Sequence, residues 1–176
     1  MNSNMKTGLI VIPTLLLTGA VISFFVLRHN TYGNTSGNRE STTASGSGID
    51  NSDLWKYVYN PGRLKVLAQT KTVTGIIEES NADPDGDQHM LLKLDAGQGE
   101  VINARNTKKK QGNLVIEAVC VNNVELKKVG NTCKGYVNHI QLPNIGDHVS
   151  VTGSYVLDTH NGWAEIHPIT QILHIK

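Results

Sequence analysis

The hydrophobic pattern divides the chain into one continuous apolar run, a polar stretch and a region of short alternating segments. The apolar run, residues 7–27, contains no charged residue, and at about 1.5 Å per residue it matches the thickness of a bilayer core. A cleavable signal peptide has a shorter apolar region and a small-residue cleavage site, whereas this run leads directly into Arg28. We therefore expect one transmembrane helix at 7–27, after an N-terminal tail at 1–6.

The polar stretch, residues 28–50, consists almost entirely of Ser, Thr, Gly and Asn. Such a composition offers too few apolar groups to offset the entropy lost on ordering. We expect a flexible linker there, which leaves 51–176 as the folded part. About 125 residues are enough for one domain with its own core.

Apolar and polar residues alternate with a period of two in several segments after residue 50, a pattern typical of half-buried β-strands. Single glycines in the first and fourth segments, Gly75 and Gly153, can allow a bend or a bulge. A long stretch at 112–143 separates the third segment from the fourth. The five predicted strands lie at 69–80, 88–95, 97–106, 144–158 and 162–175.

Five strands with a long insertion between the third and the fourth predict an all-β fold. This arrangement is typical of the OB-fold, a five-stranded Greek-key barrel, and we expect an OB-like barrel. A small β-sandwich with an added hairpin would produce a similar pattern. Abundant Gly, Val, Ile and Thr with few aromatic residues agree with short strands joined by many turns.

Four separated blocks between Trp55 and Ile172 read DPDGDQHMLLKLD, GNLVIEAVC, GYVNHIQLPNIGDHVSVTGSYVLD and GWAEIHP. Together, and in this order, they resemble an uncharacterised family of bacterial and archaeal extracytoplasmic OB-fold-like domains with a GWxEIHP motif. The resemblance implies an OB-like barrel, often behind a signal or an anchor, and no particular activity. The chain departs from the family at Asn161, because relatives carry His directly before the Gly-Trp pair and here His160 lies one place earlier.

The cysteines and one tripeptide indicate on which side of the membrane the domain lies. Cys120 and Cys133 could form a disulfide, which would stabilise the domain by about 3 kcal/mol in an oxidising compartment. Asn34, followed by Thr and Ser, matches a glycosylation acceptor. Both features favour a membrane protein whose C-terminal domain lies outside the cytoplasm, although the charges flanking the apolar run do not decide its orientation. The alternative is two separate buried thiols and a chance tripeptide.

Two polar loops contain most of the residues that could form a binding site. In an OB-fold, the loop between strands 1 and 2 and the loop between strands 4 and 5 flank the binding face. Here these loops read NADPDGDQH and DTHNGW, so we expect them at one end of the barrel. The candidate ligand-binding residues are Asp85, Asp87, His89, His160, Trp163, Glu165 and His167.

A divalent metal is the cofactor that these residues could hold. A period of two places Glu165 and His167 on one face of the last strand, and His89 opens the second strand. Imidazole and carboxylate ligands suit Zn²⁺ and similar ions, so His89, Glu165 and His167 are candidate metal ligands, with Asp85 or Asp87 in addition. In the structural alternative, these side chains fix the loops by hydrogen bonds to the backbone.

Composition and motifs favour binding over catalysis. Basic and acidic residues nearly cancel, at 16 and 15, and the short lysine run at 108–110 lies in a turn, so nucleic acid is disfavoured as a partner. Ser150 and Ser154 lie in a strand pattern without a nucleophile elbow. We predict a binding or structural module for an unknown extracytoplasmic ligand or protein partner. The alternative is a metal-dependent hydrolase, for example of a phosphodiester, that uses the His/Glu/Asp cluster with Glu165 as base.

Overall fold

The computed structural model describes residues 51–176, the part of the chain that follows the linker. The predicted tail, transmembrane helix, linker and glycosylation acceptor Asn34 lie outside the described residues. Within 51–176, no helix is both long enough and apolar enough to cross a membrane.

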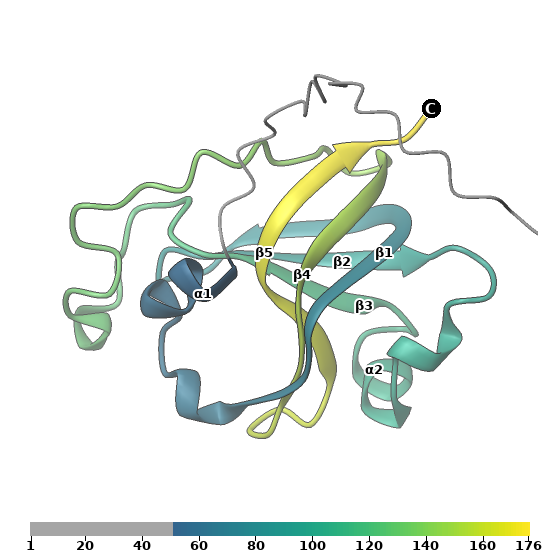
Figure 1. Ribbon diagram of the computed structural model, residues 1–176, viewed down its shortest axis with the longest axis horizontal. Coiled ribbons are helices and arrows are strands. Elements are labelled where there is room, and N and C mark those ends of the chain that lie inside the picture. The colour runs from purple at the N-terminus through teal and green to yellow at the C-terminus, as the bar shows by residue number, and fades with distance from the viewer. Residues whose placement is uncertain (1–50) are drawn as a thin grey trace, which may run out of the picture. The chain divides into compact units, whose positions relative to one another are not determined.

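Five β-strands form a closed sheet in the order β1, β2, β3, β5, β4 and back to β1 (Figure 1). Neighbouring strands are antiparallel except β3 and β5, which run parallel, so the sheet is mixed. The domain is therefore mostly β with five strands, as expected. The strands are β1 (Leu64–Ala82), β2 (Gln88–Leu94), β3 (Leu114–Ala118), β4 (His148–Asp158) and β5 (Ala164–His174).

Apolar side chains from all five strands form one core. The alternation in β1 has its physical basis here, because Val73 and Ile77 are buried in this core while Ile76 is 41% exposed. Burying one such aliphatic side chain contributes about 1.5–3 kcal/mol, so the pattern fixes which face of each strand turns inward. Further core residues are Met90, Leu92, Leu114, Ile116, Val149, Val151, Ile166 and Ile169.

Glycines allow two close approaches between strands. A β-carbon at Gly75 or at Gly153 would overlap a backbone carbonyl of the neighbouring strand. The register of β4 against β5 shifts on both sides of Gly153, which is a β-bulge position. Val149 and Val151 are buried before this irregularity and Ser154 and Val156 after it, so the buried face changes from odd-numbered to even-numbered residues at the bulge.

The prediction of a strand at 97–106 is wrong. This segment contains the 3-10 helix η3 (Gly99–Val101) and the start of helix α2 (Ala104–Lys109). The third strand is β3, in the region predicted as an insertion, and all five of its residues are buried. A strand buried on both faces shows no apolar and polar alternation, so a period of two does not reveal it. The long connection between the third and fourth strands is residues 119–147.

Two asparagines fix helix α2 against the sheet. Asn103 caps the helix by accepting hydrogen bonds from the backbone N–H groups of Arg105 and Asn106. The buried Asn106 amide donates to the carbonyls of Asn113 and Ala164. It also accepts a hydrogen bond from the Ala164 N–H. These bonds hold the start of β5 and thereby position the loop between β4 and β5.

A second apolar cluster contains residues of the N-terminal helical turns, β1, β4 and the connection 119–147, with Leu54 among its buried members. A disulfide joins Cys120 to Cys133 beside this cluster, and the rings of Tyr57 and Tyr136 stack with centroids 3.8 Å apart. The disulfide and the stacked rings hold the connection against the N-terminal turns. The short helical elements are α1 (Asn51–Leu54), η1 (Trp55–Tyr57), η2 (Pro61–Arg63) and, in the connection, η4 (Lys127–Val129).

Candidate functional site

The loops before β2 and before β5 meet at one pocket of about 370 Å³, which we call the loop pocket. The first loop contributes Asp83 and Asp85 to its lining, and the second contributes Asn161 and Trp163. Residues that are remote in the sequence therefore line one polar depression. The rest of the lining consists of Arg63, Glu79, Asn81, His89, Lys110 and Glu117.

Next to the loop pocket, one histidine and three carboxyl groups form what we call the buried cluster: His167, Glu165, Glu117 and Asp87. None of the four is more than 6% exposed. The Nδ1 atom of His167 lies 3.0 Å from Glu117 Oε2 and 3.2 Å from Glu165 Oε1. Its Nε2 atom faces Asp87 Oδ2 across 3.8 Å and has no hydrogen-bond partner. The imidazole is thus surrounded by carboxyl groups on both sides.

Strand pairing explains why these side chains meet. In the parallel pairing of β3 with β5, Val115 lies opposite Glu165, so the positions two residues further, Glu117 and His167, lie side by side. In the antiparallel pairing of β2 with β3, His89 lies opposite Glu117. Glu117 therefore stands between a histidine of β2 and a histidine of β5.

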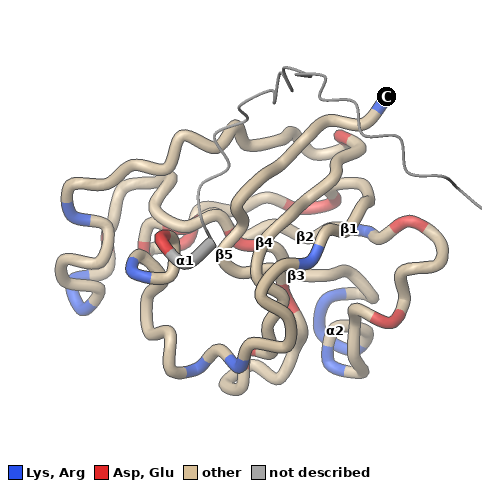
Figure 2. Tube along the Cα trace, in the orientation of Figure 1, with Lys and Arg blue, Asp and Glu red and all other residues tan. Residues whose placement is uncertain are grey.

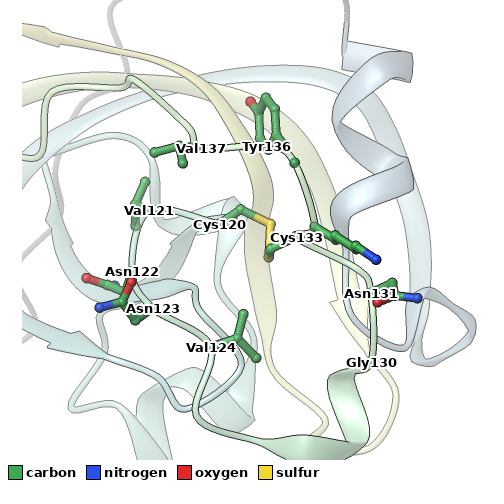
Figure 3. Close-up of a pocket in the computed structure, with 12 residues that line it drawn as sticks. Cys120, Val121, Asn122, Asn123, Val124, Gly130, Asn131, Cys133, Tyr136 and Val137 are labelled. Atoms are coloured by element: carbon green, nitrogen blue, oxygen red, sulfur yellow. A yellow bond between two sulfur atoms is a disulfide. The ribbon is translucent and has the colours of Figure 1, made fainter.

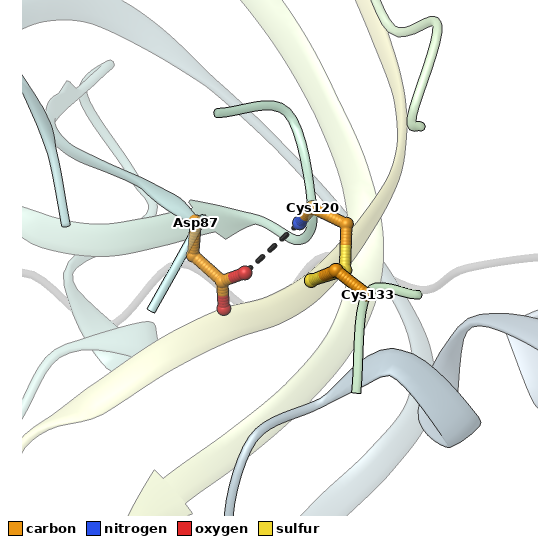
Figure 4. Close-up of side chains that lie close together, drawn as sticks. All are labelled: Asp87, Cys120 and Cys133. Carbon is orange, nitrogen blue, oxygen red and sulfur yellow. Dashed lines mark hydrogen bonds between the residues drawn. A yellow bond between two sulfur atoms is a disulfide. The ribbon is translucent and has the colours of Figure 1, made fainter. Parts of the chain in front are cut away.

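Neighbouring donors orient the outer carboxyl groups of the buried cluster. The indole Nε1 of Trp163 donates to Glu165 Oε2 over 2.7 Å. The backbone N–H of Cys120 donates to Asp87 Oδ1 over 2.9 Å, and the disulfide to Cys133 lies beside this bond (Figure 4). Each of these two carboxyl groups is therefore bonded to a fixed donor through one oxygen, while its other oxygen faces His167.

Burial and mutual attraction set the charges in the buried cluster. Burial opposes ionisation of Glu117, but the positive charge of His167 and its hydrogen bond outweigh burial and lower the pKa of Glu117 to about 2. Burial also opposes the imidazolium, yet Glu117 and Glu165 raise the pKa of His167 well above its ordinary value. Burial raises the pKa of Asp87 to about 7 and also raises the pKa of Glu165. Glu117 and His167 thus form an ion pair flanked by two carboxyl groups that resist ionisation.

Polar contacts connect the buried cluster to the surface of the loop pocket. Glu117 Oε1 lies 4.0 Å from His89 Nε2, and His89 Nε2 lies 3.3 Å from Lys110 Nζ. The same ammonium group lies 4.2 Å from the centre of the Trp163 ring, a cation–π contact. Lys110 directly follows α2, whose last turn is basic (Figure 2). A ligand that contacts Lys110 or His89 in the pocket would therefore be connected to His167 through Glu117.

Three of the predicted binding residues, Asp85, His89 and Trp163, line the loop pocket. His160 does not line it, although it lies in the same loop as Trp163. Its backbone N–H donates to Asp158 Oδ1, because the aspartate closes the turn between β4 and β5. Of these two candidate histidines, His89 therefore lines the loop pocket and His160 lies in the turn beside it.

The remaining predicted residues, Asp87, Glu165 and His167, lie in the buried cluster and not on an outer face. Of the predicted metal ligands, Glu165 and His167 are in contact, whereas His89 is separated from His167 by Glu117. The reason is topological, since β3 lies between β2 and β5 in the sheet. Among the described residues, two groups have ligand atoms that all lie within 4.8 Å of one another: Asp87 with Glu117 and His167, and Asp87 with Cys120 and Cys133. The sulfur atoms of the second group are joined in the disulfide and are not thiolate ligands.

Sequence reasoning missed Glu117, the residue shared by the loop pocket and the buried cluster. A signal exists, because Glu117 is the one charged residue in the apolar run LVIEAV, and a charge inside a buried strand requires a partner. Arg63 and Lys110 were also missed. Arg63 is the last residue of η2 and Lys110 directly follows α2, and the alternation pattern does not connect either helical element with the two loops.

A second pocket, of about 420 Å³, lies in the connection 119–147 (Figure 3). Its walls include the disulfide between Cys120 and Cys133 and the side chains of Val121 and Val124. Among the described residues that line it, Lys134 has the one charged side chain. These walls contain neither carboxylate nor imidazole, so this pocket lacks the groups for acid–base or metal chemistry.

Comparisons with known proteins identify no family and no function for the chain, so the proposed function rests on the geometry of the site. The sequence matches no model of a known protein family, and no curated protein matches it either. The resemblance based on the GWAEIHP block therefore stays a prediction.

Proposed function

We propose that the protein is a membrane-anchored, extracytoplasmic module of OB-like fold that binds a small polar ligand in the loop pocket. The observation that carries this proposal is the meeting of two loops, remote in sequence, at one polar pocket. Loops in the corresponding positions flank the binding face of OB-folds. The closed five-stranded sheet, with its long connection between β3 and β4, supports the OB-like assignment.

The proposed location rests on two features. Residues 7–27 have the length and composition of a transmembrane helix, and the disulfide between Cys120 and Cys133 is typical of compartments outside the reducing cytosol. The chain should remain with membranes after an alkaline carbonate wash, and protease added to intact cells should digest the domain. Release of the chain by the wash, or full protection of the domain, would contradict this location.

Two basic and four acidic side chains line the loop pocket, which supports a ligand that carries both an anionic group and hydrogen-bond donors. Arg63 and Lys110 supply cationic donors, and Asp83 and Asp85 supply acceptors. The buried Nε of Arg63 has no hydrogen-bond partner, and its ion-pair contact with Asp158 Oδ2 is 3.6 Å long.

Thermal-shift screening of the full-length protein in detergent, with amino acids, sugars and sugar phosphates, tests this proposal. Because charge-assisted hydrogen bonds are worth about 1.5–3 kcal/mol, Arg63→Gln should weaken binding of an anionic ligand by about tenfold or more. Lys134→Gln, in the pocket of the connection, is the matched control and should leave the affinity unchanged. Binding that is lost in the control variant and kept in Arg63→Gln would place the ligand elsewhere.

A metal-dependent hydrolase is the second candidate, because Glu117 belongs both to the loop pocket and to the group of three possible metal ligands. In this candidate Glu117, and not Glu165, is the acidic group that reaches the substrate, since Glu165 has no exposed surface. Zinc-loaded protein should then hydrolyse a simple phosphodiester such as bis(4-nitrophenyl) phosphate, and Glu117→Gln should abolish the reaction. Equal hydrolysis rates for the unmodified protein and Glu117→Gln would exclude the hydrolase function.

A further inference from the structure

The Nε2 atom of His167 is a buried polar atom without a hydrogen-bond partner. The side chain is 1% exposed, so bulk water does not reach it. Leaving such an atom unpaired costs about 1–3 kcal/mol, and proteins seldom carry this cost without a use for the group. The atom faces Asp87 Oδ2 across 3.8 Å, which is too long for a hydrogen bond between them.

The other ring nitrogen of His167 is placed as in a metal-binding histidine. A histidine that ligates a metal usually donates its second N–H to a carboxylate, which fixes the ring and the tautomer. The Nδ1 of His167 lies 3.2 Å from Glu165 Oε1, and Glu165 is held in turn by Trp163 Nε1. Glu117 Oε2 also lies 3.0 Å from Nδ1, so Glu117 would reach an ion at Nε2 through its other oxygen, Oε1. The ring is therefore oriented through Nδ1, with Nε2 aimed at Asp87.

Asp87 is oriented in a complementary way. Its Oδ1 accepts the hydrogen bond from the backbone N–H of Cys120, and its Oδ2 is the oxygen that faces His167. One ligand atom from each of Asp87, Glu117 and His167 lies within 4.8 Å of the other two. Three such atoms lie at most about 2.8 Å from a common centre, so shifts of about 0.7 Å would produce the bond lengths of a zinc ion.

The charges of the buried cluster also favour a cation. Three carboxyl groups surround one imidazole, and Glu117 alone of the four also lines the loop pocket. When the ion binds, the proton on His167 Nε2 and the proton of the Asp87 carboxyl group are released, and the two positive charges of the ion take the place of the imidazolium charge beside Glu117 and Asp87. An imidazole nitrogen with two carboxylate oxygens suits Zn²⁺, whereas Mg²⁺ and Ca²⁺ prefer oxygen ligands alone.

We propose that Asp87, Glu117 and His167 bind a divalent metal ion, with Zn²⁺ as the ion that fits best and with Glu165 as the residue that positions His167. Three protein ligands leave one position of a tetrahedral ion for water. The ion reaches the site through the loop pocket, because Glu117 is part of the pocket lining. This inference does not depend on the polar ligand proposed for the loop pocket.

Calorimetric titration of ZnCl₂ into EDTA-treated, full-length protein in detergent tests the metal site, with MgCl₂ titrated in parallel. We expect one Zn²⁺ per chain, a raised thermal unfolding midpoint and no comparable response to Mg²⁺. Asp87→Asn keeps an oxygen for the Cys120 N–H but removes the charged ligand, and should weaken Zn²⁺ binding by about a hundredfold or more. Glu165→Gln should weaken it by about 10–100-fold, as expected for a positioning residue.

Matched controls separate this site from zinc binding on the surface. His174→Gln removes an exposed histidine of the same strand, and Glu100→Gln removes an exposed acid that does not line the loop pocket. Both controls should bind Zn²⁺ like the unmodified protein. Unchanged affinity in Asp87→Asn, with circular dichroism showing a folded domain, would overturn the proposal. Loss of binding in His174→Gln, or the absence of any Zn²⁺ response, would overturn it equally.

Discussion

The ion pair between Glu117 and His167 leads to a quantitative prediction about stability. In metal-free protein, Glu117→Gln leaves the imidazolium of His167 buried without its closest anion, 3.0 Å away. Breaking a buried pair by removing one partner costs about 3–5 kcal/mol. The lowered pKa of Glu117 agrees with this in direction, because it means that the folded protein stabilises the charged carboxylate. We therefore expect Glu117→Gln to lower the free energy of unfolding by about 3 kcal/mol.

Urea unfolding at pH 7 in EDTA, followed by tryptophan fluorescence, measures this loss. The double variant Glu117→Gln/His167→Gln should lose less than the sum of the two single variants, by about 2 kcal/mol, because contacting residues are not additive. Glu78→Gln is the control, since its contact with Lys93 is between exposed groups and is worth less than about 1 kcal/mol. A loss below about 1 kcal/mol for Glu117→Gln, or additive single variants, would refute the reasoning.

Three further predictions concern the rest of the domain. Cys120→Ser opens a loop whose ends are 13 residues apart and should lower stability by about 3 kcal/mol in denaturant unfolding; an unchanged midpoint would contradict this. Gly153→Ala inserts a methyl group into occupied space and should cost about 1–3 kcal/mol, so unaltered thermal stability would refute the close strand contact. Hydrogen bonds from Thr74 and His148 lower the pKa of Asp95, so its contribution is present above pH 3.8 and is lost as the pH falls through the lowered pKa. Wild type should therefore be more stable than Asp95→Asn at neutral pH and not in strong acid, and a difference that persists in acid would contradict the assignment.

Much of the fold follows from local patterns in the sequence. The alternation around Val73 and Ile77 identifies β1 because a half-buried strand must place apolar residues on one face. Strand β3 cannot be found from alternation because both of its faces are buried and its residues are therefore apolar on both sides, except Glu117. The segment 97–106 was predicted as a strand because its few apolar residues are spaced like those of a strand. It forms helical turns instead, and Asn103 caps the helix α2.

The candidate site was predictable only in its outline. The turn residues of the two loops indicate where polar side chains gather, and Asp85 and Trp163 do line one pocket. The contact between Glu117 and His167 depends on the parallel pairing of β3 with β5, which no local pattern contains. Burial of Glu165 has the same origin, because an acidic residue in a strand is by default expected to face solvent.

A crystal structure with Zn²⁺, collected at the zinc absorption edge, tests the central claim most directly: that the two loops meet above a buried cluster able to hold a metal. The account predicts one anomalous peak within about 2–2.2 Å of ligand atoms of Asp87, Glu117 and His167. Asp85 and Trp163 should line the adjoining pocket in the same map. A zinc peak confined to surface histidines, or loops that lie at opposite ends of the sheet, would contradict the account.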